Sequence, residues 1–456
     1  MKLNILRSIL SACLLAPLMA AHAAPTHEFM LSNGMKVIVL EDHRTPAVTQ
    51  MLWYKVGAID EVNGRTGLSH ALEHMMFKAT KRHPTGDFSR LVARMGGSQN
   101  AFTSKDATVY FQRVDQSKLA SVMALEADRM SNLQFNQHEF ASEIRVVMEE
   151  RRWRTDDQPQ GMAIEALQAA AFTAHPYHHP VIGWMDDLEH LTLSDVQTWY
   201  RSWYAPNNAT LVIAGDVNAE QVRVLAQRYF GAIAAKKLPV RKPQNEPEQR
   251  GIRRTTVKAS AENPFVILAF KAPVLRDVEK DDDVFALSVL SAVLDGYDNA
   301  RLKARLVRGD KIANSAGSGY DEYTARGPAL FVLEGAPVAG VSTSQLETAL
   351  RAEVTRIATQ GVEPAELQRI KTQLIASRIY GRDSVFARAM EIGGLESAGI
   401  SYRQLDRIIE RIRDVTAQQV QAAAQKYFGD DGLTVVTLQP LPLNGRQAPP
   451  PPALLH

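Results

Sequence analysis

Two histidines and a glutamate lie close together in one apolar segment, "GLSHALEHMMFKAT" (Gly67 to Thr80). Because residues four apart share one face of a helix, His70 and His74 can direct ring nitrogens at a common point. Glu73 lies beside that face and reaches the same space. The flanking residues are apolar enough to bury this helix, and buried imidazole or carboxylate groups without partners are costly. The segment therefore predicts a shared divalent cation.

Zinc is the cation that best suits this donor set, because the only cysteine, Cys13, lies in a segment that export would remove. A hydrolytic zinc site uses three protein ligands and a water, and the predicted helix over residues 138–157 offers the third ligand. Glu143 and Glu150 are seven residues apart and share a face, whereas Glu149 is turned about 100° from Glu150. We predict one Zn²⁺ per chain, with Glu150 as third ligand and Glu143 as a carboxylate that holds the ligand set.

The elements that must position these side chains are short strands and longer helices. Strand-like runs rich in β-branched and aromatic residues occupy residues 35–42, 48–56, 107–114 and 209–217, with helical patterns between them. A charged, proline-rich stretch at residues 236–251 breaks the pattern, and strand-like runs then resume. This alternation predicts an α+β fold with an interdomain linker.

An internal similarity indicates two related domains. Asp195 to Val217 can be laid over Gln419 to Gln439, so that in both copies a helix ends at aromatic residues and leads into a buried strand. Chance similarity between two generic units is the alternative, although each copy ends its own domain. We predict a signal peptide, a zinc-binding α+β domain, a linker, a second similar α+β domain and a proline-rich tail at residues 1–23, 24–240, 241–256, 257–440 and 441–456.

The N-terminal residues predict export. Lys2 and Arg7 precede an apolar run that ends in an Ala-His-Ala motif, so we place signal-peptide cleavage after Ala23 and expect a periplasmic protein. A lipoprotein anchored at Cys13 is the alternative. No later run approaches the ~20 apolar residues of a membrane span, so we predict no transmembrane segment in the mature chain. Loss of the two cations takes the formal charge from +2 to 0, which does not indicate nucleic-acid binding.

The order His-x-x-Glu-His is the inverse of the commoner zinc helix His-Glu-x-x-His. With 75 residues between His74 and Glu150, the chain resembles the pitrilysin/insulinase family of inverted-zincin metallopeptidases, particularly its short bacterial and mitochondrial-processing-peptidase-like branch. The resemblance extends over most of the chain in four segments that occur in the family's order: "VGAIDEVNGRTGLSHALEHMMFKAT", "GGSQNAFTSKDATVYF", "PYHHPVIGWMDDLEHLT" and "WYAPNNATLVIAGDV".

The resemblance implies a zinc endopeptidase in which His70, His74 and Glu150 bind zinc and Glu73 is the general base toward a zinc-bound water. It also implies that each domain is a mostly antiparallel sheet packed with helices, and that the chain forms half of a clam-like chamber. Its substrates would be peptides or unfolded protein segments.

The resemblance places Asn100 and Ala101 on an edge strand that adds the substrate as a further strand. Phe102 would line a side-chain pocket, although a core aromatic residue in a strand is an equal alternative. Arg308 in the second domain would help to bind substrate and stabilise the developing oxyanion.

One position departs from the family pattern, because Asn314 stands where a tyrosine is typical. We therefore expect a heterodimer with a zinc-free chain of the same fold, with a homodimer as the second choice. Two other function classes stay open. A non-catalytic assembly subunit would typically lack parts of the zinc motif, and a metal-binding protein without hydrolytic function would leave Glu73 unexplained.

Overall fold

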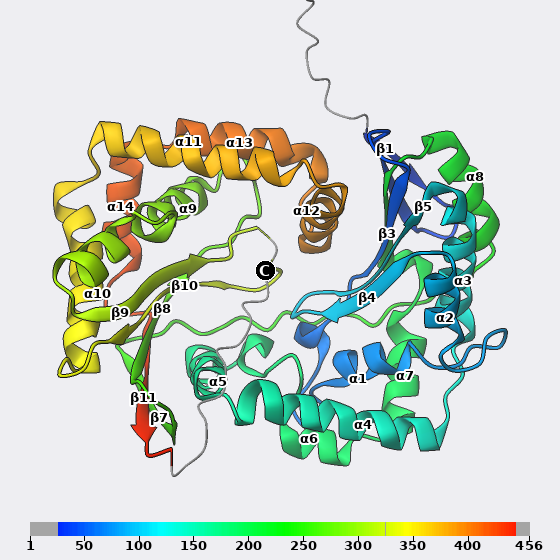
Figure 1. Cartoon of the computed structure of the whole chain (residues 1–456), viewed down its shortest axis with the longest axis horizontal. Helices are drawn as coiled ribbons and strands as arrows, with labels where there is room; N and C mark the ends of the chain where they lie inside the picture. Colours follow the sequence, from blue (N-terminus) through cyan, green and yellow to red (C-terminus); the bar gives the residue numbers. More distant parts are fainter. Residues whose placement is uncertain (1–25, 324, 444–456) are drawn as a thin grey trace, which may run out of the picture.

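The computed structural model describes residues 26–323 and 325–443, and in these residues it contains two sheets, each packed with helices (Figure 1). The predicted signal peptide, Cys13 and the proline run near the C-terminus lie outside the described residues. The predicted α+β class is confirmed. Each sheet is mixed, with one parallel pair of strands among antiparallel ones.

In the part of the chain that the structure describes, the first sheet has six strands, in the order β1-β2-β6-β3-β5-β4. Their bounds are Thr26–Met30, Lys36–Glu41, Ala209–Gly215, Ala47–Tyr54, Thr108–Asp115 and Ser98–Thr103. The central strand β6 is buried at every residue, as its apolar sequence predicts. The strand β4 pairs only with β5, so one of its edges is open for further pairing.

The helices of the first half cover one face of this sheet, except α5, which packs on the second sheet through Ala163 and Leu167. They are α1 (Leu68–Met75), α2 (Asp87–Arg94), α3 (Leu119–Asn132), α4 (Gln137–Arg151), the π-helical turn η3 (Arg152–Asp156), α5 (Pro159–Ala171), α6 (Met185–His190), α7 (Leu193–Trp203) and α8 (Ala219–Phe230). Short 3-10 turns connect these helices to a neighbouring strand or helix, at Ala58–Asp60 (η1), Gln116–Lys118 (η2), Pro176–His178 (η4) and Pro206–Asn208 (η5).

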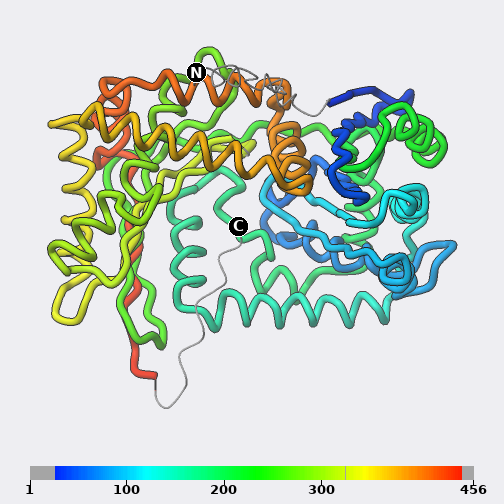
Figure 2. The backbone as a smooth tube through the Cα atoms, turned by 45° about the horizontal axis from the view of Figure 1, so that its top comes forward, coloured from blue at the N-terminus to red at the C-terminus, as the bar shows by residue number. Residues whose placement is uncertain are grey.

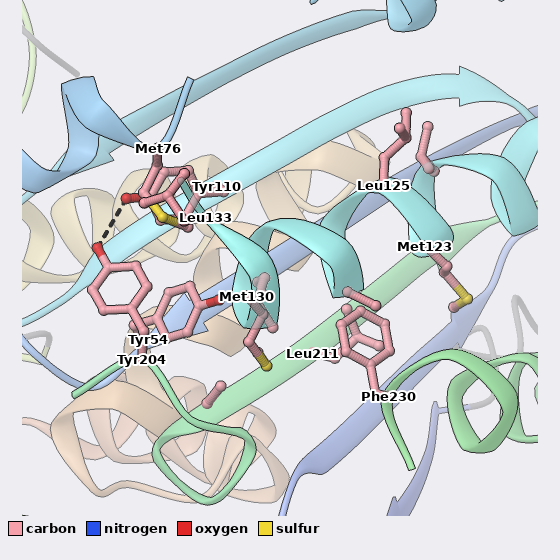
Figure 3. Packing of buried hydrophobic residues seen from close by; sticks show 14 of the residues in the cluster. Tyr54, Met76, Tyr110, Met123, Leu125, Met130, Leu133, Tyr204, Leu211 and Phe230 are labelled. Atoms are coloured by element: carbon pink, nitrogen blue, oxygen red, sulfur yellow. Dashed lines mark hydrogen bonds between the residues drawn. The ribbon is translucent and has the colours of Figure 1, made fainter. Parts of the chain in front are cut away.

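Aromatic side chains tie the sheet to these helices (Figure 3). The rings of Tyr54 and Tyr204 stack at 4.1 Å, and the hydroxyls of Tyr110 and Tyr204 lie 2.9 Å apart. All three residues are buried in the first core, and the contact between Tyr110 and Tyr204 gives both of their hydroxyl groups a partner. This core is the rigid base beneath α1.

Among the described residues, the second sheet has five strands in the order β7-β11-β8-β10-β9. Their bounds are Arg253–Ser260, Leu433–Leu441, Phe265–Ala272, Ala329–Pro337 and Ala313–Tyr320. Its helical elements are α9 (Asp282–Asp295), the π-helical η6 (Lys303–Gly309), α10 (Thr343–Gln360), α11 (Pro364–Gly381), α12 (Val385–Ala398), η7 (Tyr402–Gln404), α13 (Leu405–Asp414) and α14 (Ala417–Tyr427).

The two sheets share one topology. Leaving out β1, the order β2-β6-β3-β5-β4 matches β7-β11-β8-β10-β9 strand for strand, and in both sheets the first two of these strands run parallel. The internal similarity in the sequence corresponds to α7 followed by β6 and to α14 followed by β11. Two structurally similar halves therefore follow one another along the chain.

The boundary between the halves is less simple than the sequence indicates. Strand β7 begins at Arg253, inside the predicted linker of residues 241–256, and pairs with β11. The remainder is held in place: the Arg241 side chain lies 4.4 Å from the Trp203 ring and 2.6 Å from Asp60. The other domain limits stay predictions.

Helix α12 belongs to the second half in sequence but packs on the first sheet, where Figure 2 shows its orange tube beside blue strands. Gly393 permits this approach, because a Cβ atom there would lie 2.0 Å from the Trp53 ring. A 2.8 Å ion pair between Lys36 and Glu396 joins the same surfaces. None of the described helices is long and apolar enough to span a membrane.

Candidate metal centre

The helix α1 is anchored at its first turn by a buried carboxylate. Gly67 has a φ of 84°, in the left-handed region that favours glycine, and offers no side chain to cap the helix. Instead, the two Glu61 oxygens accept hydrogen bonds from the backbone amides of Gly67 and Ser69, each at 2.7 Å. These bonds satisfy amides that have no partner within the helix. Glu61 thus sets the position of the helix that carries His70 and His74.

Helix α4 packs on α1 through its own apolar face. Phe140 and Val147 are buried in the first core, and Ile144 and Met148 pack against it. These positions recur at helical spacing, so the adjoining positions of α4 are directed at α1. This arrangement brings the carboxylate of Glu150, far along the sequence, to the histidines.

Three donor atoms converge at this junction. Glu150 Oε2 lies 3.3 Å from His74 Nε2 and 3.7 Å from His70 Nε2. Donor atoms about 2.1 Å from a tetrahedral zinc ion are about 3.4 Å from one another, so these separations fit zinc. In the described part of the chain, these three residues form the only group of ligand atoms close enough to share a metal ion.

A second carboxylate holds His74. Glu143 Oε2 lies 3.2 Å from His74 Nδ1, and Glu143 Oε1 accepts a hydrogen bond from Lys78 Nζ at 2.5 Å. Although burial favours the neutral ring, the carboxylates of Glu143 and Glu150 raise the pKa of His74 to about 9. The Nδ1 contact leaves Nε2 directed at the shared point, which is the arrangement common among histidine ligands.

His70 is in a different environment from His74. It is 8% exposed, and its Nδ1 has no hydrogen-bond partner among the described residues. Burial, and then the charge of His74, lowers the pKa of His70 to about 4. The ring is therefore neutral at neutral pH, the form that binds a metal.

Glu73 lies beside the three converging atoms without being one of them. Thr103 at the end of β4 donates a hydrogen bond to Glu73 Oε2 at 2.5 Å. Burial raises the pKa of Glu73. Because Oε2 has this partner, Oε1 is the oxygen left for another group.

Three of the predicted substrate-binding residues lie on β4, and the fourth, Arg308, lies in the second half of the chain. Asn100, Ala101 and Phe102 lie on the open-edged strand β4. Phe102 meets Trp53 edge to face at 5.9 Å and lines a cavity of about 640 Å³ between the two sheets. Ala101 packs instead against the first core.

Arg308 is not brought to this centre. Its Nη2 donates hydrogen bonds to the Asp298 carbonyl and, at 2.9 Å, to Asn299 Oδ1, and these are its only polar contacts among the described residues. Asn314 is occupied within the second sheet, because its Nδ2 donates to the Pro337 carbonyl at 3.1 Å. The predicted role of Arg308 therefore has no support in this structure.

Two contacts around the centre were not predicted from the sequence: Thr103 with Glu73 and Lys78 with Glu143. Lys78 follows His74 by four residues, so this spacing could have indicated that it lies near the histidines. The partner of Glu73 depends on the approach of a separate strand, and no local pattern indicates it.

Comparisons with known proteins agree along the chain. A family model described as insulinase (peptidase family M16) matches residues 36–183, and one described as peptidase M16 inactive domain matches residues 190–374. The chain is 32% identical over 444 residues to the zinc protease PqqE of Helicobacter pylori, covering 95% of this chain and 98% of that protein. It is 25% identical over 406 residues to an uncharacterized zinc protease, YmxG, of Bacillus subtilis, covering 88% of this chain and 96% of that protein.

Two solved structures have the same fold. The crystal structure of a protease from H. pylori matches with a TM-score of 0.86 and 30% identity, over 91% of this chain and all of that chain (100%). The periplasmic protease PqqL from Escherichia coli matches with a TM-score of 0.78 over 94% of this chain and 49% of that chain. At 19% identity, the match to PqqL shows the fold alone.

Proposed function

Because the chain belongs to the insulinase family of zinc proteases, peptidase family M16, we propose that it is an endopeptidase acting on peptides or unfolded protein segments. The observation that carries this proposal is the convergence of His70, His74 and Glu150 beside an uncommitted carboxylate oxygen of Glu73. The fold supports the same activity. Strand β4 has an open edge, and its last residue, Thr103, contacts the Glu73 carboxylate.

His70 and His74, through Nε2, and Glu150, through Oε2, would hold zinc. When bound, zinc would polarise the scissile carbonyl group and acidify water. Glu143 would keep the His74 ring in place through Nδ1. Burial keeps His70 neutral and ready to bind.

Glu73 would take the proton of the attacking water at Oε1 and later give it to the leaving amine. The hydroxyl of Thr103 would hold Oε2 and fix the carboxylate next to the end of β4. A substrate paired with the open edge of β4, along Asn100 and Ala101, would thereby have its backbone beside Glu73. Main-chain pairing gives affinity for extended segments of many sequences.

We also propose that the working enzyme is a dimer. Arg308 is held within the second half, and Asn314 offers no phenol hydroxyl, so a second chain would supply groups that this chain lacks. A zinc-free chain of the same fold is our first choice for the partner, and a second copy is our second choice. A periplasmic location fits the sequence of the N-terminus, and PqqL, which shares the fold, is a periplasmic protease.

A non-catalytic subunit is the alternative function. It is favoured by Asn314 and opposed by the presence of the three metal-binding residues and Glu73. Measurement of peptide cleavage by the purified, zinc-loaded chain, with and without a co-expressed partner, separates the two.

The test of the mechanism is Glu73→Gln. Loss of the base should lower turnover of an unstructured peptide by ~10²–10⁴-fold and leave the zinc content unchanged. Glu149→Gln is the matched control, because Glu149 is exposed and, among the residues that the structure describes, its side chain has a polar contact only with Arg152. Full turnover by a zinc-loaded Glu73→Gln protein would rule out the proposed role.

A further inference from the structure

Three arginines follow Glu150 closely, and they have different environments. Arg151 is buried and bonded to Glu165 and the Gly183 carbonyl. Arg152 is partly exposed and contacts Glu149. Only Arg154 is directed at the metal centre, where its Nη1 lies 3.0 Å from Glu150 Oε1.

The backbone at Arg154 is unusual. Residues Arg152–Asp156 form a π-helical turn that continues α4, and such turns often occur at functional sites. The Arg154 side chain is 50% exposed, and it has no other hydrogen bond or ion pair with the described residues. Glu150 engages one end of the guanidinium group, so the other donors are available to a ligand.

Charges around the centre leave Arg154 free to attract anions. Its Nη1 contacts Glu150 Oε1, and the other oxygen of that carboxylate faces His74, so the Arg154 charge lies next to the metal centre. Lys78 is already neutralised by Glu143. A dication at Glu150 would take up the charge of that carboxylate, so the Arg154 charge would be uncompensated.

We propose that Arg154 binds an acidic side chain of the peptide substrate near the scissile bond and so makes the enzyme prefer acidic peptides. Guanidinium groups bind carboxylates through paired hydrogen bonds, and this one is half exposed beside Glu150. The proposal rests on the proposed peptidase function. It adds to that function a preference that the open edge of β4 cannot provide.

The probes are unstructured peptides with one cleavage site, in which glutamate, glutamine or lysine is placed in turn at each nearby position. Binding is measured by fluorescence anisotropy with zinc-loaded Glu73→Gln protein, and KM and kcat are measured with the wild type. At one position or more, glutamate should bind about three- to tenfold more tightly than glutamine. Arg154→Gln should remove this preference, and Arg154→Glu should favour lysine.

Arg152→Gln is the matched control, since it removes the same charge two residues away and should keep the preference. The change in Arg154→Gln should appear in KM, with kcat and zinc content nearly unchanged. Equal binding of glutamate and glutamine peptides at every position would overturn the proposal, and so would a preference that survives in Arg154→Gln. Loss of zinc from Arg154→Gln would also overturn it, because Arg154 would then act by holding Glu150. If the wild type cleaves no peptide, the peptidase proposal fails, and the binding preference still decides the role of Arg154.

Discussion

The zinc affinity of this centre should depend on Glu143, a residue that is not itself a ligand. Its carboxylate contacts His74 Nδ1 at 3.2 Å and is bonded to Lys78 on its other oxygen. In Glu143→Ala, His74 would lose the group that fixes its ring. Lys78 would also lose its partner and would add a positive charge next to the dication.

The expected loss of zinc affinity follows from these two lost contacts. Removal of a group that orients a metal ligand typically weakens metal binding by about 10–100-fold, or ~1.4–2.7 kcal/mol. Glu143→Gln can still accept a hydrogen bond from Nδ1 but has no charge, so it should fall near the lower limit. Glu143→Ala also leaves Lys78 unpaired and should reach the upper limit. The zinc affinity should therefore decrease from the wild type to Glu143→Gln and further to Glu143→Ala.

The assay is competition for zinc with a chromogenic chelator at pH 7.5, with the thermal midpoint of each metal-free protein as the check on folding. Glu139→Gln is the control, because Glu139 lies on the same helix and contacts Thr85 rather than the centre. Glu143→Ala that binds zinc as tightly as the wild type would refute the reasoning. An equal loss of zinc affinity in Glu139→Gln would show instead that any lost negative charge on this helix weakens zinc binding.

Three further predictions concern stability. Although burial opposes ionisation, the backbone amides of residues 173–175 hold the pKa of Glu246 at about 2, so its stabilising effect is present above pH ~4.5 and is lost as the pH falls to about 2. Glu246→Gln should lower the free energy of unfolding in urea by ~1–3 kcal/mol at pH 7, and the difference from wild type should disappear by about pH 2. Gly393→Ala should cost ~1–3 kcal/mol through its clash with Trp53, whereas Gly381→Ala, where a Cβ meets nothing within 4 Å, should cost none. Removal of zinc with a chelator should lower the thermal midpoint of the wild type, but not that of His70→Ala.

Local spacing was sufficient to predict one half of the metal centre. His70, Glu73 and His74 lie within one turn of a helix, and the pitch of a helix sets their directions whatever surrounds it. The same pitch put Glu143 and Glu150 on one face of α4, and the structure directs both at the histidines. The α+β class and the repeated helix–strand unit followed from periodicity that is equally local.

Contacts between distant elements could not be predicted this way. The sequence predicted a substrate-binding role for Arg308, but it did not indicate the hydrogen bond from its Nη2 to Asn299. Thr103 reaches Glu73 only because β4 ends above α1. Helix α12 crosses to the first sheet because Gly393 fits against Trp53.

The sequence by itself thus determined the helix, the donor types and their common face, because these depend on neighbours within one or two turns. The tertiary structure alone decided that Glu150 meets the histidines and that Thr103 holds Glu73. These arrangements depend on how α1, α4 and β4 pack around the first core, and packing sums many weak contacts between residues far apart in the chain.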